Sequence, residues 1–154
     1  MKKLNACCKL FFYFSLIFIN PVFAAGPDCS DINRWPTQST ANRLSDFGIP
    51  AANIQFDKTK TTLIVSEAMS ESQRSAWLIR ENERSRQLGF ASNKNSFDDR
   101  SFPQVIYKQI YRVTFTDKAD RHVEFIITTL ASDEECSVGV ESVALISKEI
   151  IWPN

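Results

Sequence analysis

The chain has 154 residues, with 18 Lys and Arg balanced by 18 Asp and Glu, and a single histidine. This length fits one domain. With only four glycines and no internal repeat, a solenoid or a long flexible linker is not expected. No basic stripe is present, which argues against nucleic acid as the main partner.

The N-terminal segment has the order of a secretory signal peptide. A basic start is followed by an apolar run over residues 10–19 and by small residues around Ala24. The apolar run has about half of the roughly 20 residues that a membrane-spanning helix needs. We therefore expect residues 1–24 to be removed and residues 25–154 to form a single domain. That domain would be periplasmic or secreted, with no stable membrane insertion after cleavage.

Removal of the signal peptide would leave two of the four cysteines, Cys29 and Cys136. An even pair in a small domain of an oxidising compartment normally forms a disulfide. A catalytic thiolate needs a lowered pKa, whereas three acids directly before Cys136 would raise it. A zinc site needs three or four nitrogen or sulfur ligands, and His122 is the only histidine. We predict a structural Cys29–Cys136 disulfide, no metal and no cofactor.

Two helices and one strand are expected in the first half of the mature chain. Pro36 suits the first turn of a helix over residues 37–47, whose apolar residues recur at helical spacing. Residues 60–68 are rich in β-branched side chains and predict a strand. A capping-box pattern then begins a helix over residues 71–88. The second half of that helix, residues 80–87, is almost wholly polar and cannot be buried.

The second half of the chain predicts strands over residues 104–116, 121–131 and 139–151. In the first two, apolar and polar residues alternate, as in an antiparallel sheet with one wet face. Residues 117–120 match a four-residue hairpin turn. The central residues of the predicted buried face are Val113, Phe115, Val123, Phe125 and Ile127. The expected fold class is α+β, a three- or four-stranded antiparallel sheet with two helices packed on one face and one disulfide.

Familiar catalytic motifs are missing from the sequence. It contains no G-x-S-x-G, H-E-x-x-H, P-loop or G-x-G-x-x-G pattern, and His122 falls on the predicted wet face of a strand. The acid pairs at residues 98–99 and 134–135 leave open a small secreted hydrolase, although adjacent acids rarely span a cleft as glycosidase carboxylates must. We assign no catalytic residue and expect a protein that is not an enzyme.

Short motifs near both ends resemble those of small exported bacterial single-domain proteins of unassigned function. The first is D-C-S-D at residues 28–31, followed by Trp35 and Pro36. The second is E-E-C-S at residues 134–137. Relative to that pattern, residues 70–102 resemble an insertion. The resemblance implies export, but it implies no activity and no catalytic residue.

These observations favour a non-catalytic binding protein, such as an immunity or inhibitor protein that acts on a protein partner in the periplasm or extracellular space. Two alternatives stay open: the small secreted hydrolase and a structural factor of the cell envelope. Loops on rigid scaffolds often carry recognition, so the recognition surface is placed between Trp77 and Pro103. Its predicted partner-binding residues are Trp77, Arg80, Arg84, Arg86, Phe90, Arg100 and Phe102.

Among the three tryptophans, Trp77 is the best candidate for a contact residue, because it lies beside the charged half of its helix. Trp35 and Trp152 each precede a proline and are interpreted as structural. Mixed charge of the kind found at residues 80–87 sets specificity and encounter rate more than bulk affinity. A charged helix half is also what an ordinary solvated face presents, and this alternative stays open.

Overall fold

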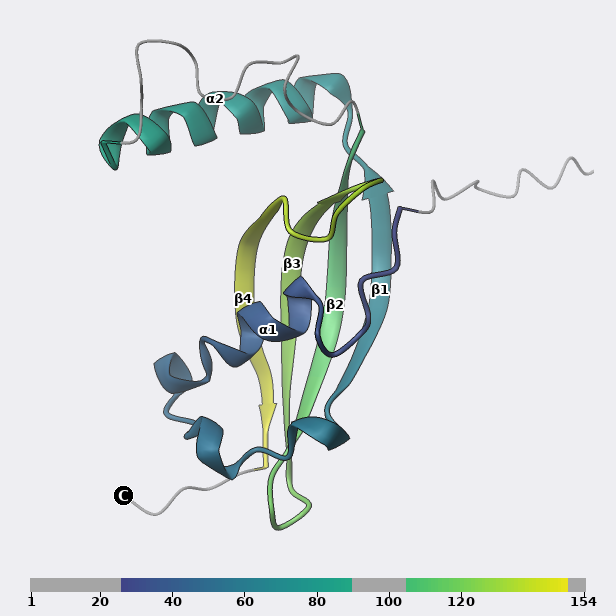
Figure 1. Cartoon of the computed structure of the whole chain (residues 1–154), viewed down its shortest axis with the longest axis vertical. Coiled ribbons are helices and arrows are strands. Elements are labelled where there is room, and N and C mark those ends of the chain that lie inside the picture. The colour runs from purple at the N-terminus through teal and green to yellow at the C-terminus, as the bar shows by residue number, and fades with distance from the viewer. Residues whose placement is uncertain (1–25, 90–104, 150–154) are drawn as a thin grey trace, which may run out of the picture.

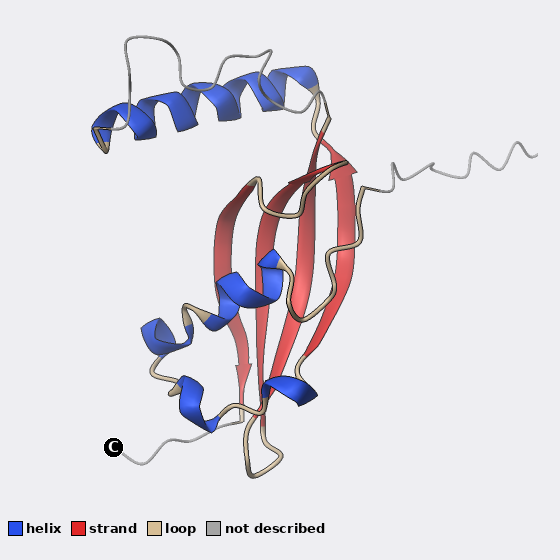
Figure 2. Cartoon of the chain, in the orientation of Figure 1, coloured by secondary structure: helices blue, strands red, loops and turns tan. Residues whose placement is uncertain are grey.

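A computed structural model of the chain describes residues 26–89 and 105–149. Within these residues four antiparallel strands form one sheet in the order β1-β2-β3-β4 (Figures 1 and 2). The strands are β1 Lys60–Ala68, β2 Ile106–Thr116, β3 His122–Ser132 and β4 Gly139–Lys148. Neighbours in sequence are neighbours in the sheet, so the topology is a meander with a helix inserted between β1 and β2. This confirms the α+β class. The predicted signal peptide lies outside the described residues.

The hairpin between β2 and β3 is closed by the predicted turn, and Asp117 organises it. Its carboxylate accepts the backbone N–H groups of Ala119 and Arg121 at 2.8 and 2.9 Å, and an ion pair of 2.7 Å from the Arg121 guanidinium. Burial alone would raise the pKa of Asp117, but the hydrogen bonds from Arg121 and Ala119 outweigh it and hold this pKa below its usual value. Asp120 takes the left-handed conformation, with φ 56°, which Asp tolerates in turns. The ionised carboxylate therefore fixes the register of the hairpin.

One face of the sheet carries the main core. The alternation of β2 and β3 places Val113, Phe115, Val123, Phe125 and Ile127 on that face, and each is fully buried. This confirms the predicted buried face. Val105, the first residue of the alternating pattern in the predicted strand over residues 104–116, precedes β2 and is exposed.

The predicted helix over residues 37–47 is divided in two. Helix α1 covers Trp35–Ala41, and a separate 3₁₀ turn, η1, covers Leu44–Phe47. Arg43 has φ −106° and ψ 3°, which lies outside the helical range and interrupts the α-helical ladder. The apolar stripe survives the break: Leu44 is fully buried and Phe47 packs edge-on against Phe125. Helix α1 crosses the core face of the sheet (Figure 1).

The N-terminal arm is fastened to the same face by a chain of buried hydrogen bonds. Cys29 donates its backbone N–H to the Tyr111 hydroxyl at 3.1 Å, and that hydroxyl donates to Gln109 Oε1 at 2.8 Å. The Gln109 amide in turn donates to the carbonyl of Pro27 at 2.8 Å. Gly26 lies so close to the Tyr107 ring that a Cβ atom would fall 2.5 Å from it. The arm is therefore part of the packed domain.

A disulfide joins this arm to the loop between β3 and β4. Cys29 and Cys136 are bonded, with their Cα atoms 5.8 Å apart and 107 positions apart in sequence. Cys29 is fully buried in the main core, and Cys136 packs against that core. This confirms the predicted disulfide.

The long helix α2, Glu71–Gln87, begins at the predicted capping box of Ser70 and Gln73. The expectation that both helices pack on one face needs a correction. Trp77 and Leu78 of α2 form a second cluster with Ile106 and Leu130, whose positions in β2 and β3 point away from the main core. Helix α2 lies over one end of the sheet, while α1 crosses the core face (Figure 2). The apolar side chains of α2 thus pack on residues of the opposite face.

Candidate functional site

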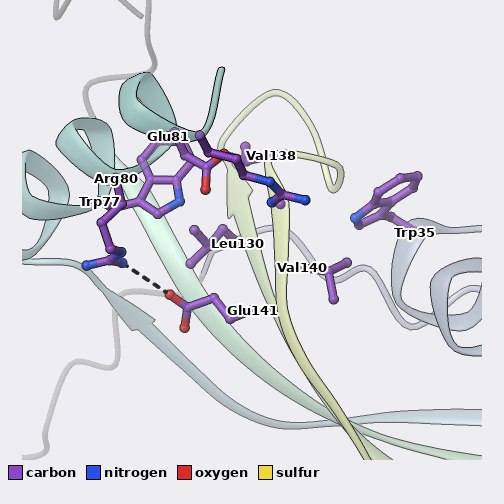
Figure 3. A pocket seen from close by; sticks show the side chains of 10 residues that line it. Trp35, Trp77, Arg80, Glu81, Leu130, Val138, Val140 and Glu141 are labelled. Atoms are coloured by element: carbon purple, nitrogen blue, oxygen red, sulfur yellow. Dashed lines mark ion pairs between the residues drawn. The ribbon is translucent and has the colours of Figure 1, made fainter. Parts of the chain in front are cut away.

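A groove of about 500 Å³ lies where α2 passes the start of β4 (Figure 3). Its helix wall is formed by Trp77, Arg80, Glu81 and Arg84. These residues follow the spacing i, i+3, i+4, i+7, so they share one face of α2. The opposite wall is the end of the β3–β4 loop and the first residues of β4, Val138 to Glu141. Leu130 of β3 also lines the groove.

Glu141 ties the helix wall to the sheet. Its carboxylate lies 2.9 Å from Lys108 Nζ in β2 and 3.9 Å from the Arg80 guanidinium in α2 (Figure 3). The cations are half exposed or more, so each pair is screened by solvent and adds little stability by itself. The geometric effect is larger: two cations from different elements meet at one carboxylate. Arg80 is thereby directed across the groove.

The charges that line the groove balance, with Arg80 and Arg84 against Glu81 and Glu141. Arg80, Lys108 and Glu141 form a group with two cations and one carboxylate. Glu81 and Arg84 add one charge of each sign, and neither forms an ion pair with another described residue. One positive charge is left over only when Lys108 is counted, which pairs with Glu141 from outside the groove lining. Because Lys108 already pairs with Glu141, and Arg84 forms no ion pair with another described residue, Arg84 is placed to meet a ligand that brings a carboxylate.

The two tryptophans that line the groove differ in exposure. Trp77 is only 5% exposed and anchors α2 on Ile106 and Leu130, so its edge alone reaches the groove. Trp35, interpreted from the sequence as structural, is 40% exposed and lines the groove from the side of α1 (Figure 3). As the first residue of α1 it precedes the buried stretch that begins at Pro36. The Trp-Pro pattern located the start of the helix but did not show which way the indole turns.

The structure brings together three of the seven predicted partner-binding residues: Trp77, Arg80 and Arg84. Arg86 pairs with Glu83 on the helix surface at 3.7 Å and does not line the groove, so the groove considered as the candidate site excludes it. The remaining three residues, Phe90, Arg100 and Phe102, lie outside the described part of the chain. The partner-binding assignment as a whole stays a prediction.

No protein-family model, no curated protein and no solved structure matches the chain. The resemblance to small exported bacterial proteins therefore stays a prediction. Among the described helices, none is long and apolar enough to cross a membrane. Within residues 26–89 and 105–149, no three His, Cys, Asp or Glu side chains gather as a metal site would require.

A second hollow of about 720 Å³ lies at the other end of the sheet, around His122. The His122 ring lies 3.2 Å from the Thr116 hydroxyl, through Nδ1. Lys58 and Asp120 line the same hollow and pair with each other at 2.7 Å. Its lining residues are all polar or charged, whereas the groove beside α2 also has tryptophan, leucine and valine side chains. The groove beside α2 is the stronger candidate site.

Of the acids considered for a hydrolase, Glu134 and Glu135 do not line the groove. Glu134 and Glu135 sit in the β3–β4 loop, where both donate their backbone N–H groups to the Ser132 hydroxyl at 3.3 and 3.2 Å. Their role in the described structure is to form this turn. The other pair, residues 98–99, lies outside the described residues.

Proposed function

We propose that the protein is an exported, non-catalytic binding protein that recognises a protein partner in the periplasm or extracellular space, as an inhibitor or immunity protein does. One observation carries the proposal. In the polar half of α2, Glu81 and Arg84 line a groove. The exposed Trp35 of α1 lines the same groove. Aromatic and arginine side chains are the residues that most often dominate binding at protein interfaces.

The rigidity of the surroundings supports a recognition role. The arm before Trp35 is fixed by the disulfide and by the Tyr111 hydrogen bonds. The loop before Val138 is held by the same disulfide, and Glu141 joins α2 to the sheet. Binding groups held in place before association lose less conformational entropy when the partner docks.

The groove is tested by two charge reversals on the same helix. The mature protein is used to capture its partner from an envelope extract, and the partner's affinity is then measured for each variant by calorimetry. Arg84→Glu is expected to weaken binding about tenfold or more, because it places a carboxylate where the partner's carboxylate would lie. Arg86→Glu is the matched control, since Arg86 pairs outside the groove, and its affinity is expected to be unchanged. Equal affinities of the wild type and both variants would contradict the proposed site.

Export is tested separately by the intact mass of the protein made from the full gene. The order of basic, apolar and small residues in the first 24 positions leads us to expect a mature chain that starts at Ala25. The mass should also be two hydrogens lower than that of the reduced chain, because of the Cys29–Cys136 bond. A protein that still starts at Met1 and sediments with the membrane would contradict export.

A further inference from the structure

The groove lies on the free edge of the sheet. In the order β1-β2-β3-β4, strand β4 has no strand on its outer side within the described residues. Residues 139–145 likewise form no backbone hydrogen bond on that side with any described residue. An edge strand presents unpaired N–H and C=O groups at every second residue, which is a template for one more strand. Three of the residues that line the groove, Gly139 to Glu141, are the first residues of this edge.

Side chains from both faces of the sheet flank the β4 edge in the groove. Trp35 approaches from α1, which covers the core face of the sheet, and Arg84 belongs to α2, which packs on the opposite face. Side chains of a strand point alternately to the two faces of its sheet. A strand added beside β4 would therefore turn one side chain toward Trp35 and the next toward Arg84.

From this geometry we propose that the groove binds an extended segment of the partner protein, which adds a fifth strand to the sheet along the start of β4. This inference rests on the proposed binding function and specifies the partner's chemistry. The segment carries an acidic residue, which meets Arg84, next to an apolar or aromatic residue, which packs on Trp35. Backbone hydrogen bonds supply affinity, and the alternating side chains supply specificity.

The features of β4 favour a short segment of another protein over a second copy of this chain. The strand has extra residues at Glu141 and Ile146, where its pairing with β3 shifts register. Such bulges interrupt long edge-to-edge pairing. Antiparallel pairing of two β4 strands would also bring Lys148 of the second copy toward Gly139 and thus toward Arg84, which lines the groove beside it. A partner segment with a carboxylate meets no such repulsion.

The inference is tested with a display library of random peptides about ten residues long, which is ample for a strand of typical length. The mature, disulfide-bonded protein serves as bait. We expect enriched peptides to carry Asp or Glu directly beside an apolar or aromatic residue. One enriched peptide is then synthesised with and without N-methyl groups on alternate backbone amides. Methylation of the edge that faces β4 is expected to weaken binding about tenfold or more, because it removes hydrogen bonds that the strand needs.

Protein variants and amide exchange locate the bound peptide. Selection on Arg84→Glu should lose the preference for acids, while selection on Arg86→Glu should keep it. Amides of residues 139–145 should exchange more slowly when the peptide is bound. Three results would each overturn the inference: no enrichment, unchanged affinity after methylation of either edge, or concentration-dependent dimerisation that protects β4 without any peptide. If the natural partner still discriminates Arg84→Glu from Arg86→Glu while methylation has no effect, the proposed function stands and strand addition is wrong.

Discussion

Phe125→Ala is expected to lower the free energy of unfolding by about 3–5 kcal/mol, as truncation of a core aromatic does. Phe125 is fully buried at the centre of β3. Its ring meets Phe47 at 5.2 Å and Phe115 at 6.0 Å between centroids, both edge to face. The side chain thus joins the 3₁₀ turn after α1 to the sheet, and its loss leaves a cavity that neither element can fill alone.

Urea denaturation of the oxidised protein measures this effect, and Arg112→Ala is the matched control. Arg112 lies opposite Ile126 on the other face of the sheet and is exposed. Its truncation is expected to change stability by no more than about 0.5 kcal/mol. A loss below about 1 kcal/mol for Phe125→Ala would contradict the described register, because a shift of one residue exchanges the two faces of a strand.

The β half was predictable because two simple signals agree there. The alternation of apolar and polar residues located β2 and β3, and the short run of turn residues from Asp117 to Asp120 fixed their register. Strand β1 was found at its observed bounds from its β-branched residues. In these segments, local preference and tertiary packing favour the same structure, so the sequence contains the information locally.

Long-range packing decided the features that the sequence did not predict. Gln109 is fully buried on the core face, where the alternation of apolar and polar residues in β2 predicts an apolar side chain. Its partners, Pro27 and Ser66, lie 82 and 43 residues away, so no local signal marks them. The sequence does contain a signal for the position of α2, at the ends of β2 and β3. Two apolar residues are adjacent there, Ile106 with Tyr107 and Leu130 with Ala131. Because adjacent residues of a strand point to opposite faces, such doublets indicate that both faces of the sheet are covered.

The candidate site was only partly predictable for the same reason. The uneven composition of α2 identified Arg80 and Arg84, because a polar helix half must face solvent or a partner. Trp35 was missed because its exposure depends on how α1 crosses the sheet. The first residues of β4 line the groove at an open edge because β4 is the last strand in the sheet. No short sequence motif encodes the order of the strands.

Loss of the disulfide is the second large effect that we expect. Replacing both Cys29 and Cys136 by serine should lower the free energy of unfolding by about 2–5 kcal/mol, the usual cost of removing a native disulfide from a small domain. The bond spans 107 positions, so its absence restores much freedom to the unfolded chain; the loop-entropy relation gives roughly 4–5 kcal/mol for a loop of this length. The buried serine hydroxyl at position 29 adds a penalty of its own.

Reduced wild-type protein separates these two contributions, because it keeps the thiol side chains and loses only the bond. We expect the reduced protein to unfold at lower urea than the oxidised protein, and the double serine variant to unfold at lower urea still. The native hydrogen bonds from Cys29 to Tyr111 and from Gln109 to Pro27 do not involve sulfur. They should therefore keep the arm in place while the protein is folded. Equal unfolding midpoints for oxidised and reduced protein would show that this contact network, and not the covalent bond, holds the arm on the sheet.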